Sequence, residues 1–215
     1  MHRETFDTII RIKVGAGDKE RTFEIHKGVL CMYSGYFERS LNSCFTEAKT
    51  GEVTLATEDP QVFEIFQYWL YTRSNDALTK EHGWGTLCKV WIFGDAHEVP
   101  LLQNNAMDTL MQKFLNDWAL PTDQLHLVYD NTTEGAPLRR FLGDIIAKTG
   151  QAKTFLTPER VVQFSKEAMT DILRIVWGTN AKRLNKVDIQ KVDVCRHYHV
   201  HEDGASCAGG DPKTS

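Results

Sequence analysis

Cysteine and histidine side chains that suit metal chemistry gather near the C-terminus of this 215-residue chain. They are Cys195, His197, His199, His201 and Cys207. If residues 192–201 are extended, the first four project from one side of a strand, because successive side chains of a strand alternate between its faces. Thiolate and imidazole are ligands that zinc prefers. The pattern therefore predicts a zinc site, provided that the strand bends and the loop with Cys207 folds back.

The same tail allows a second interpretation. It contains no C-x-x-C pair, and alternate side chains of a straight strand lie about 6.5–7 Å apart, which is too far for all of them to reach one ion. The alternative is a solvated histidine-rich tail, or a strand whose valine and tyrosine side packs on helices. Residues 204–215 are polar and glycine-rich, and we expect them to be disordered.

Residue patterns of common enzymes do not occur in the sequence. It has no G-x-S-x-G elbow, no H-E-x-x-H helix and no paired carboxylates. The glycines at positions 15 and 17 lack the rest of a phosphate loop, and His26 is interpreted as structural, at a junction between a strand and a helix. A zinc enzyme built on the C-terminal cluster is a third function class, but nothing indicates a base beside an open ligand position. We expect no catalytic residues, and no cofactor apart from the zinc.

Composition limits the classes of protein to consider. A net charge of −4 and 41% hydrophobic residues fit one domain with a helical extension, or two small domains. The odd number of cysteines, five, is typical of a reducing compartment rather than a disulfide framework. Neither a membrane-spanning run nor a secretory N-terminus is evident, and the mild acidity argues against nucleic-acid binding. We therefore expect a protein of the cytoplasm or nucleus.

The expected elements begin with three strands. Alternating apolar residues predict strands over Thr8–Val14 and Thr22–Ile25, joined by a turn at Gly15–Asp18, and a third strand over Glu52–Leu55. Between the last two strands, helical turns follow His26, and a second helix starts at Ser34. Three strands cannot bury an apolar face by themselves, so we expect helices to cover them.

Helical periodicity dominates the rest of the sequence. Asp59 and Pro60 suit the cap and first position of a helix that ends near Thr72. Another helix is expected over residues 87–97, and Pro100 precedes a further one. The buried stripe of that helix is expected to comprise Met107, Leu110, Met111, Phe114 and Trp118. Further helices are expected to start near Leu120, Gly135 and Thr157, and the last is expected to be long, with Met169, Ile172, Leu173 and Val176 on it.

Several of these motifs, in this order, resemble the BTB/POZ domain. The run TFEIHKGVLCMYSGYF at residues 22–37 resembles the central signature of that family. FEIFQYWLYT resembles its third-helix signature, which usually ends in Leu-Tyr-Thr-Gly, and VWIFGDAHEVPLLQNNAMDTL resembles its closing helical hairpin. The resemblance implies an α+β BTB/POZ fold over residues 1–118, then a helical extension over 119–180 and a flexible tail over 181–215. The extension is similar to that of short BTB proteins from filamentous fungi.

This resemblance implies a protein–protein interaction module. Some members of the family recruit cullin scaffolds of ubiquitin ligases through a hydrophobic-x-Glu motif before the third strand, and Phe45-Thr46-Glu47 matches that motif. Phe45 would then be an exposed anchor in a cullin pocket, and Glu47 would orient the loop. Alternatively, Phe45 packs under the loop and Glu47 is solvated. A competing function is a regulator that binds a transcription or signalling partner without a cullin.

The resemblance leaves self-association open. Dimeric members of the family commonly exchange an additional N-terminal helix and strand, whereas the first strand of this chain is expected within about ten residues of Met1. A swapped dimer is therefore not expected. If the protein is an adaptor, the helical region over Leu120–Asn180 must recognise the substrate.

Overall fold

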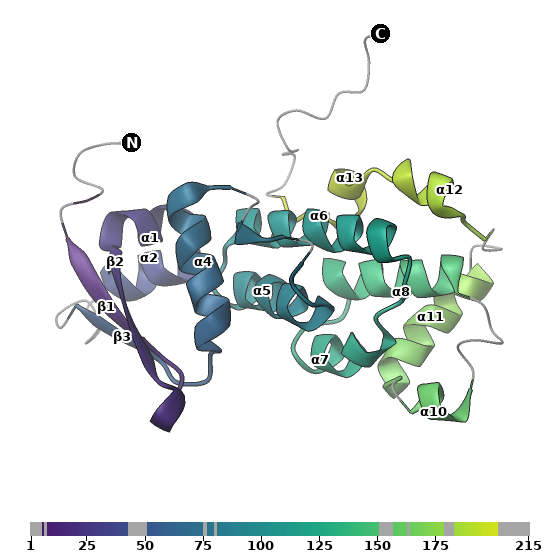
Figure 1. Cartoon of the computed structure of the whole chain (residues 1–215), viewed down its shortest axis with the longest axis horizontal. Coiled ribbons are helices and arrows are strands. Elements are labelled where there is room, and N and C mark those ends of the chain that lie inside the picture. The colour runs from purple at the N-terminus through teal and green to yellow at the C-terminus, as the bar shows by residue number, and fades with distance from the viewer. Residues whose placement is uncertain are drawn as a thin grey trace, which may run out of the picture. The chain divides into compact units, whose positions relative to one another are not determined.

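The structure is a computed structural model, which describes residues 6, 8–42, 51–74, 77–79, 81–150, 157–162, 164–178 and 183–201 (Figure 1). The chain divides into two compact units. Unit 1 comprises residues 1–79 and 89–105, and unit 2 comprises residues 80–88 and 106–215. Within the described residues, no helix combines the length and the apolar character that crossing a membrane requires.

A three-stranded sheet with the order β2-β1-β3 forms one layer of unit 1. The central strand β1 (Ile9–Val14) pairs antiparallel with β2 (Arg21–His26) and parallel with β3 (Glu52–Leu55). Alternate side chains of all three strands are buried, as a sheet with one covered face requires. They are Ile10, Ile12, Val14, Phe23, Ile25, Val53 and Leu55. The predicted strands are confirmed to within one residue at each end.

The predicted hairpin between β1 and β2 is also confirmed. Gly15 and Gly17 have φ angles of +86° and +59°, a region that favours glycine because it has no Cβ. A Cβ on Gly15 would lie 3.1 Å from the carbonyl oxygen of Lys19, so the turn is crowded as well as left-handed. The short 3-10 helix η2 (Gly17–Lys19) then leads the chain into β2.

Three helices of unit 1 lie beside the sheet (Figure 1). They are α1 (Lys27–Tyr33), α2 (Gly35–Asn42) and α4 (Pro60–Thr72). Their buried side chains are Val29, Leu30, Phe37, Leu41, Val62, Phe63, Phe66, Trp69 and Leu70. The predicted cap of α4 is confirmed, because Asp59 Oδ1 accepts a hydrogen bond from the Gln61 main-chain N–H at 3.0 Å.

Helix α4 ends at a residue that departs from the family signature. Arg73 occupies the left-handed region, with a φ of +52°, where that signature has glycine. Its guanidinium carbon lies 3.7 Å from the Tyr33 ring centroid and 3.8 Å from that of Trp69. These cation–π contacts help to offset the strain of a side chain in this conformation.

Two longer helices follow, α5 (Trp84–Ala96) and α6 (Pro100–Asp117). Each contributes residues to both units. A tight turn joins them, in which the Val99 main-chain N–H donates to the Gly94 carbonyl at 2.8 Å. Pro100 is the first residue of α6, as predicted, because its missing N–H costs nothing there.

Ser34 joins three segments of unit 1. This side chain is 1% exposed and lies between α1 and α2. Its hydroxyl donates to the His97 carbonyl at 2.6 Å and accepts from the Phe37 main-chain N–H at 3.2 Å. One hydroxyl therefore caps α2 and ties it to the end of α5.

We predict that Ser34→Ala lowers the free energy of unfolding by about 1–2 kcal/mol, because it removes a helix cap and leaves the buried His97 carbonyl without this donor. Chemical denaturation measures the loss. Gln61→Ala, at an exposed helical position of the same unit, is the control and should change stability by no more than about 0.5 kcal/mol. Equal stability of the two variants would contradict this role of Ser34.

His97 is buried among aromatic rings at the same place. Its ring stacks on Phe93 at a centroid distance of 4.1 Å and on Phe37 at 5.6 Å, and its Nδ1–H donates to the Phe93 carbonyl at 3.0 Å. Burial lowers the pKa of His97 and raises that of Glu58, whose carboxylate lies 3.9 Å from the imidazole. His97 is therefore neutral at pH 7 and forms no ion pair with Glu58.

This burial makes the stability of unit 1 depend on pH. As the pH falls through 6.5, the ordinary pKa of histidine, His97 takes up a proton in the unfolded chain. Buried His97 in the folded chain stays neutral to lower pH, so the free energy of unfolding decreases. Glu58 has the opposite effect, but closer to its ordinary pKa of 4.5. We predict that His97→Gln flattens the pH dependence of stability between about pH 7.5 and 6. The exposed-site variant Gln61→Ala, which changes no titratable group, should keep the wild-type slope; equal slopes in all three proteins would refute the prediction.

Unit 2 is built from helices in its described residues. They are η4 (Thr122–Gln124), α7 (Leu125–Asp130), α8 (Pro137–Thr149), α10 (Pro158–Val161), α11 (Lys166–Gly178), α12 (Lys186–Gln190) and α13 (Val194–Tyr198). Figure 1 shows α8 beside α11, and the two pack closely. One apolar stripe of α8 is buried and comprises Leu138, Phe141, Leu142, Ile145 and Ile146.

Two predictions about the helices of unit 2 are wrong. Trp118 lies beyond the end of α6, has a φ of +46° and is 41% exposed, although its ring stacks on Phe114. The long helix expected from Thr157 is divided into α10 and α11, because the Ser165 hydroxyl accepts from the Ala168 N–H at 3.1 Å and so caps a new helix. Val176 lies on α11, as predicted, and is 39% exposed.

Candidate functional site

The segment that carries Cys195 is helical, so the prediction of an extended strand over residues 192–201 is wrong. Helix α13 begins after Asp193, whose side chain accepts a hydrogen bond from the Arg196 main-chain N–H at 3.0 Å. This cap stabilises the first turn of a helix, and the local signal outweighs the alternation of apolar residues. Residues four apart on a helix share a face, so Cys195 and His199 come together and His197 is directed elsewhere.

Three of the predicted zinc ligands lie close together. Ligand atoms of Cys195, His199 and His201 all lie within 4.8 Å of one another, and each residue is half-buried. The Cys195 thiol is 3.2 Å from His201 Nε2. His197 is not in this group, and its main-chain carbonyl accepts from the Arg140 guanidinium at 3.2 Å. Cys207 lies outside the described residues.

A carboxylate from α6 orients one of these imidazoles. His199 Nε2 lies 2.9 Å from Asp108 Oδ1, and the His199 side chain is 6% exposed. Because an ionised carboxylate only accepts hydrogen bonds, Nε2 carries the proton. Neutral His199 then keeps its lone pair on Nδ1, and a carboxylate beside a histidine is a common partner of metal-binding imidazoles.

Tyr198 anchors this C-terminal segment to α8. Its hydroxyl donates to Asp144 Oδ2 at 2.8 Å, and its ring packs edge-on against Phe141. The side chain is only 5% exposed, and burial raises the pKa of the phenol. Asp144 also pairs with Lys148 at 2.7 Å, so the carboxylate has two partners. These contacts hold the segment in place against α8.

We predict that Tyr198→Phe lowers the free energy of unfolding of unit 2 by about 1.5–3 kcal/mol, because it removes a hydrogen bond to a charged group while the ring can still pack. Hydrogen exchange of the α13 amides measures the loss locally. Tyr68→Phe, at a 54% exposed position on α4, is the matched control and should leave those amides unchanged. Unchanged protection in Tyr198→Phe would show that ring packing alone holds the segment.

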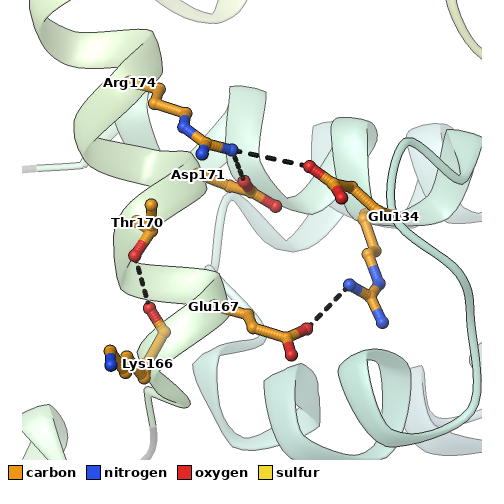
Figure 2. A pocket seen from close by; sticks show the side chains of 7 residues that line it. Glu134, Lys166, Glu167, Thr170, Asp171 and Arg174 are labelled. Carbon is orange, nitrogen blue, oxygen red and sulfur yellow. Dashed lines mark hydrogen bonds and ion pairs between the residues drawn. The ribbon is translucent and has the colours of Figure 1, made fainter.

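A hollow of about 550 Å³ lies over α8 and α11 (Figure 2). Three acidic and three basic side chains line it: Glu134, Glu167, Asp171, Arg139, Lys166 and Arg174. Arg174 lies 3.3 Å from Asp171 on the same helix and 3.7 Å from Glu134, and Figure 2 shows the second contact reaching from α11 to Glu134. Because the six charges balance, the hollow has no net charge with which to attract a strongly charged ligand.

Arg139 has a structural role at the base of this hollow. It is 7% exposed, and its guanidinium donates to Glu167, to the Thr132 hydroxyl and to the carbonyls of Tyr129 and Thr132. The same group lies 4.5 Å from the Tyr129 ring centroid. A buried charge with this many partners is well satisfied, so Arg139 ties α7, α8 and α11 together.

The candidate partner residues lie outside the part of the chain that the structure describes. Phe45 and Glu47 fall in residues 43–50, between the end of α2 at Asn42 and the start of β3 at Glu52. The described elements therefore agree with the predicted position of the motif, in the connection before the third strand. Exposure of Phe45 stays a prediction.

Sequence reasoning missed Asp108 and Arg139. Asp108 and His199 are 91 residues apart, so no local spacing connects them. Arg139 is half of the basic pair Arg139-Arg140, a pattern typical of a solvated helix face, and its burial depends on the packing of α7 and α11 around it. The only local signal is its place near the start of an amphipathic helix.

Comparison with known proteins identifies part of the chain. Residues 2–84 match the family model described as the BTB/POZ domain. This range contains every element from β1 to α4 and ends at Trp84, the first residue of α5. No curated protein matches the sequence. The similarity of residues 85–118 to the closing hairpin of the family stays a prediction. The similarity of the helical extension to fungal proteins stays a prediction as well.

Proposed function

We propose that this chain, a BTB/POZ domain protein through residues 2–84, is a substrate adaptor of a cullin-RING ubiquitin ligase in the cytoplasm or nucleus. BTB/POZ domains bind other proteins, so the coarser conclusion, a protein–protein interaction module, follows from the family itself. The cullin is the finer part of the proposal, and it depends on the motif at Phe45 and Glu47.

The observation that carries the proposal is the position of Phe45-Thr46-Glu47. These residues follow α2 and precede β3 in a domain whose family includes cullin-binding members with a hydrophobic-x-Glu motif at that place. An aromatic side chain that enters a partner pocket is a frequent centre of binding energy. The sheet and α2 are rigidly packed, so they present the connection from a stable base.

Substrate recognition would fall to unit 2. Its hollow over α8 and α11 combines balanced charges with the methylene groups of long side chains. Such a surface can bind a polar peptide through exchanged ion pairs rather than through net charge. Glu134 and Arg174 are both more than half exposed, so a partner can reach them.

We predict that Phe45→Ala removes the cullin from an affinity purification of the tagged full-length protein in its own cells. Because Phe45 is proposed to be an exposed anchor, stability should change by no more than about 0.5 kcal/mol. Tyr68→Ala, which truncates an exposed aromatic side chain elsewhere in unit 1, is the matched control and should retain the cullin.

Other outcomes point to other functions. A large loss of stability in Phe45→Ala would indicate that the side chain packs in the domain. Absence of a cullin from the wild-type sample would contradict the adaptor and favour a regulator that binds a transcription or signalling partner.

One observation favours such a regulator as the second candidate. Phe6, Ile9 and Tyr71 are each more than 40% exposed and lie around His26. The His26 main-chain N–H donates to the Tyr71 hydroxyl at 3.0 Å, and the same hydroxyl is 2.9 Å from His26 Nδ1. His26 therefore has the structural role predicted for it, while the apolar rings beside it remain available to a partner.

A further inference from the structure

We propose that Cys195, His199 and His201 bind one zinc ion, and that Asp108 orients His199 from outside the coordination shell. The site differs from the five-residue strand that the sequence predicts, because α13 directs His197 away from the other two imidazoles. It is also independent of the proposed cullin contact, which depends on Phe45 and Glu47.

The distances need little adjustment to hold zinc. Tetrahedral zinc with a Zn–S bond of about 2.3 Å and Zn–N bonds of about 2.0–2.1 Å places its ligand atoms roughly 3.3–3.6 Å apart. The Cys195 thiol is already 3.2 Å from His201 Nε2, and all three ligand atoms lie within 4.8 Å of one another. Small rotations about the side-chain torsions can therefore close the site.

The ligand types favour zinc over hard cations. Magnesium and calcium prefer oxygen ligands, whereas a thiolate with two imidazoles suits zinc. Copper binds one thiolate with two imidazoles as well, in trigonal sites with a weak axial ligand, whereas zinc takes such ligands in a tetrahedron. The described residues supply three ligands, and a water molecule or a further protein ligand completes the tetrahedron.

Asp108 supplies the outer shell that such a site needs. It holds the Nε2–H of His199 at 2.9 Å, which fixes the ring orientation and the tautomer. Cys195 precedes Tyr198 in the sequence by three residues, and His201 follows it by three. The contacts of Tyr198 with α8 therefore position the segment that carries both ligands. A zinc ion would then join α13 to the residues that follow it and would stabilise the end of unit 2.

Cobalt substitution tests the proposal on the full-length protein, purified with a reductant and freed of metal with a chelator. We expect one cobalt ion per chain, a near-ultraviolet charge-transfer band from the thiolate, and loss of that band when zinc displaces the cobalt. Cys195→Ser should abolish the band, and His199→Ala or His201→Ala should weaken binding strongly. Asp108→Asn should lower zinc affinity about 10–100-fold.

His197→Ala is the matched control, because it removes a neighbouring imidazole that lies outside the cluster. It should bind cobalt and zinc like the wild type. Circular dichroism of each metal-free variant checks that Tyr198 still holds the segment. Less than about one ion per chain, a thiolate band that survives Cys195→Ser in the folded protein, or equal losses in His197→Ala and His199→Ala would each overturn the proposal.

Discussion

The single apolar face of the three-stranded sheet is the constraint on which unit 1 depends. Ile12 and Val14 of the central strand are fully buried, yet the part of the chain that the structure describes has no second sheet to cover the three strands. Helices α1, α2 and α4 must therefore pack on that face, and β3 must return to lie parallel to β1. A parallel neighbour cannot be reached by a tight hairpin. The chain has to travel through α1, α2 and residues 43–50, and so the fold itself creates the connection in which the proposed cullin anchor lies.

Polar groups that are buried and fully paired fix the geometry of both units. In unit 1 the Ser34 hydroxyl joins the start of α2 to the end of α5. In unit 2 Arg139 and Tyr198 have the same structural role, because each links separate helices through hydrogen bonds to carbonyls or carboxylates. A buried polar group that loses its hydrogen-bond partner destabilises the folded state. These groups therefore favour the one arrangement of helices in which all their partners are in place. The proposed zinc ligands benefit from this, since Tyr198 positions the residues around it on α8.

Local signals in the sequence predicted most of unit 1, and long-range contacts explain what was missed. Alternation predicted β1, and the pair Asp59-Pro60 predicted the start of α4, because both signals act within a few residues. The tail shows the limit of alternation. Cys195 to His201 alternates like a strand, but Asp193 caps a helix there, and only the packing of Tyr198 on α8 confirms that choice. Asp108 could not be assigned to the cluster from the sequence, because its position opposite His199 exists only after the helices of unit 2 have assembled.

The most direct test of the account is a binding titration between the purified full-length protein and the N-terminal region of a cullin from the same organism, followed by calorimetry. We predict a saturable complex of one cullin fragment per chain, with a negative heat-capacity change from burial of Phe45 and its surroundings, and at least a tenfold loss of affinity in Phe45→Ala, which is about 1.4 kcal/mol. No saturable complex, or equal affinity of the wild type and Phe45→Ala, would contradict the claim that this BTB/POZ domain docks on a cullin through that motif.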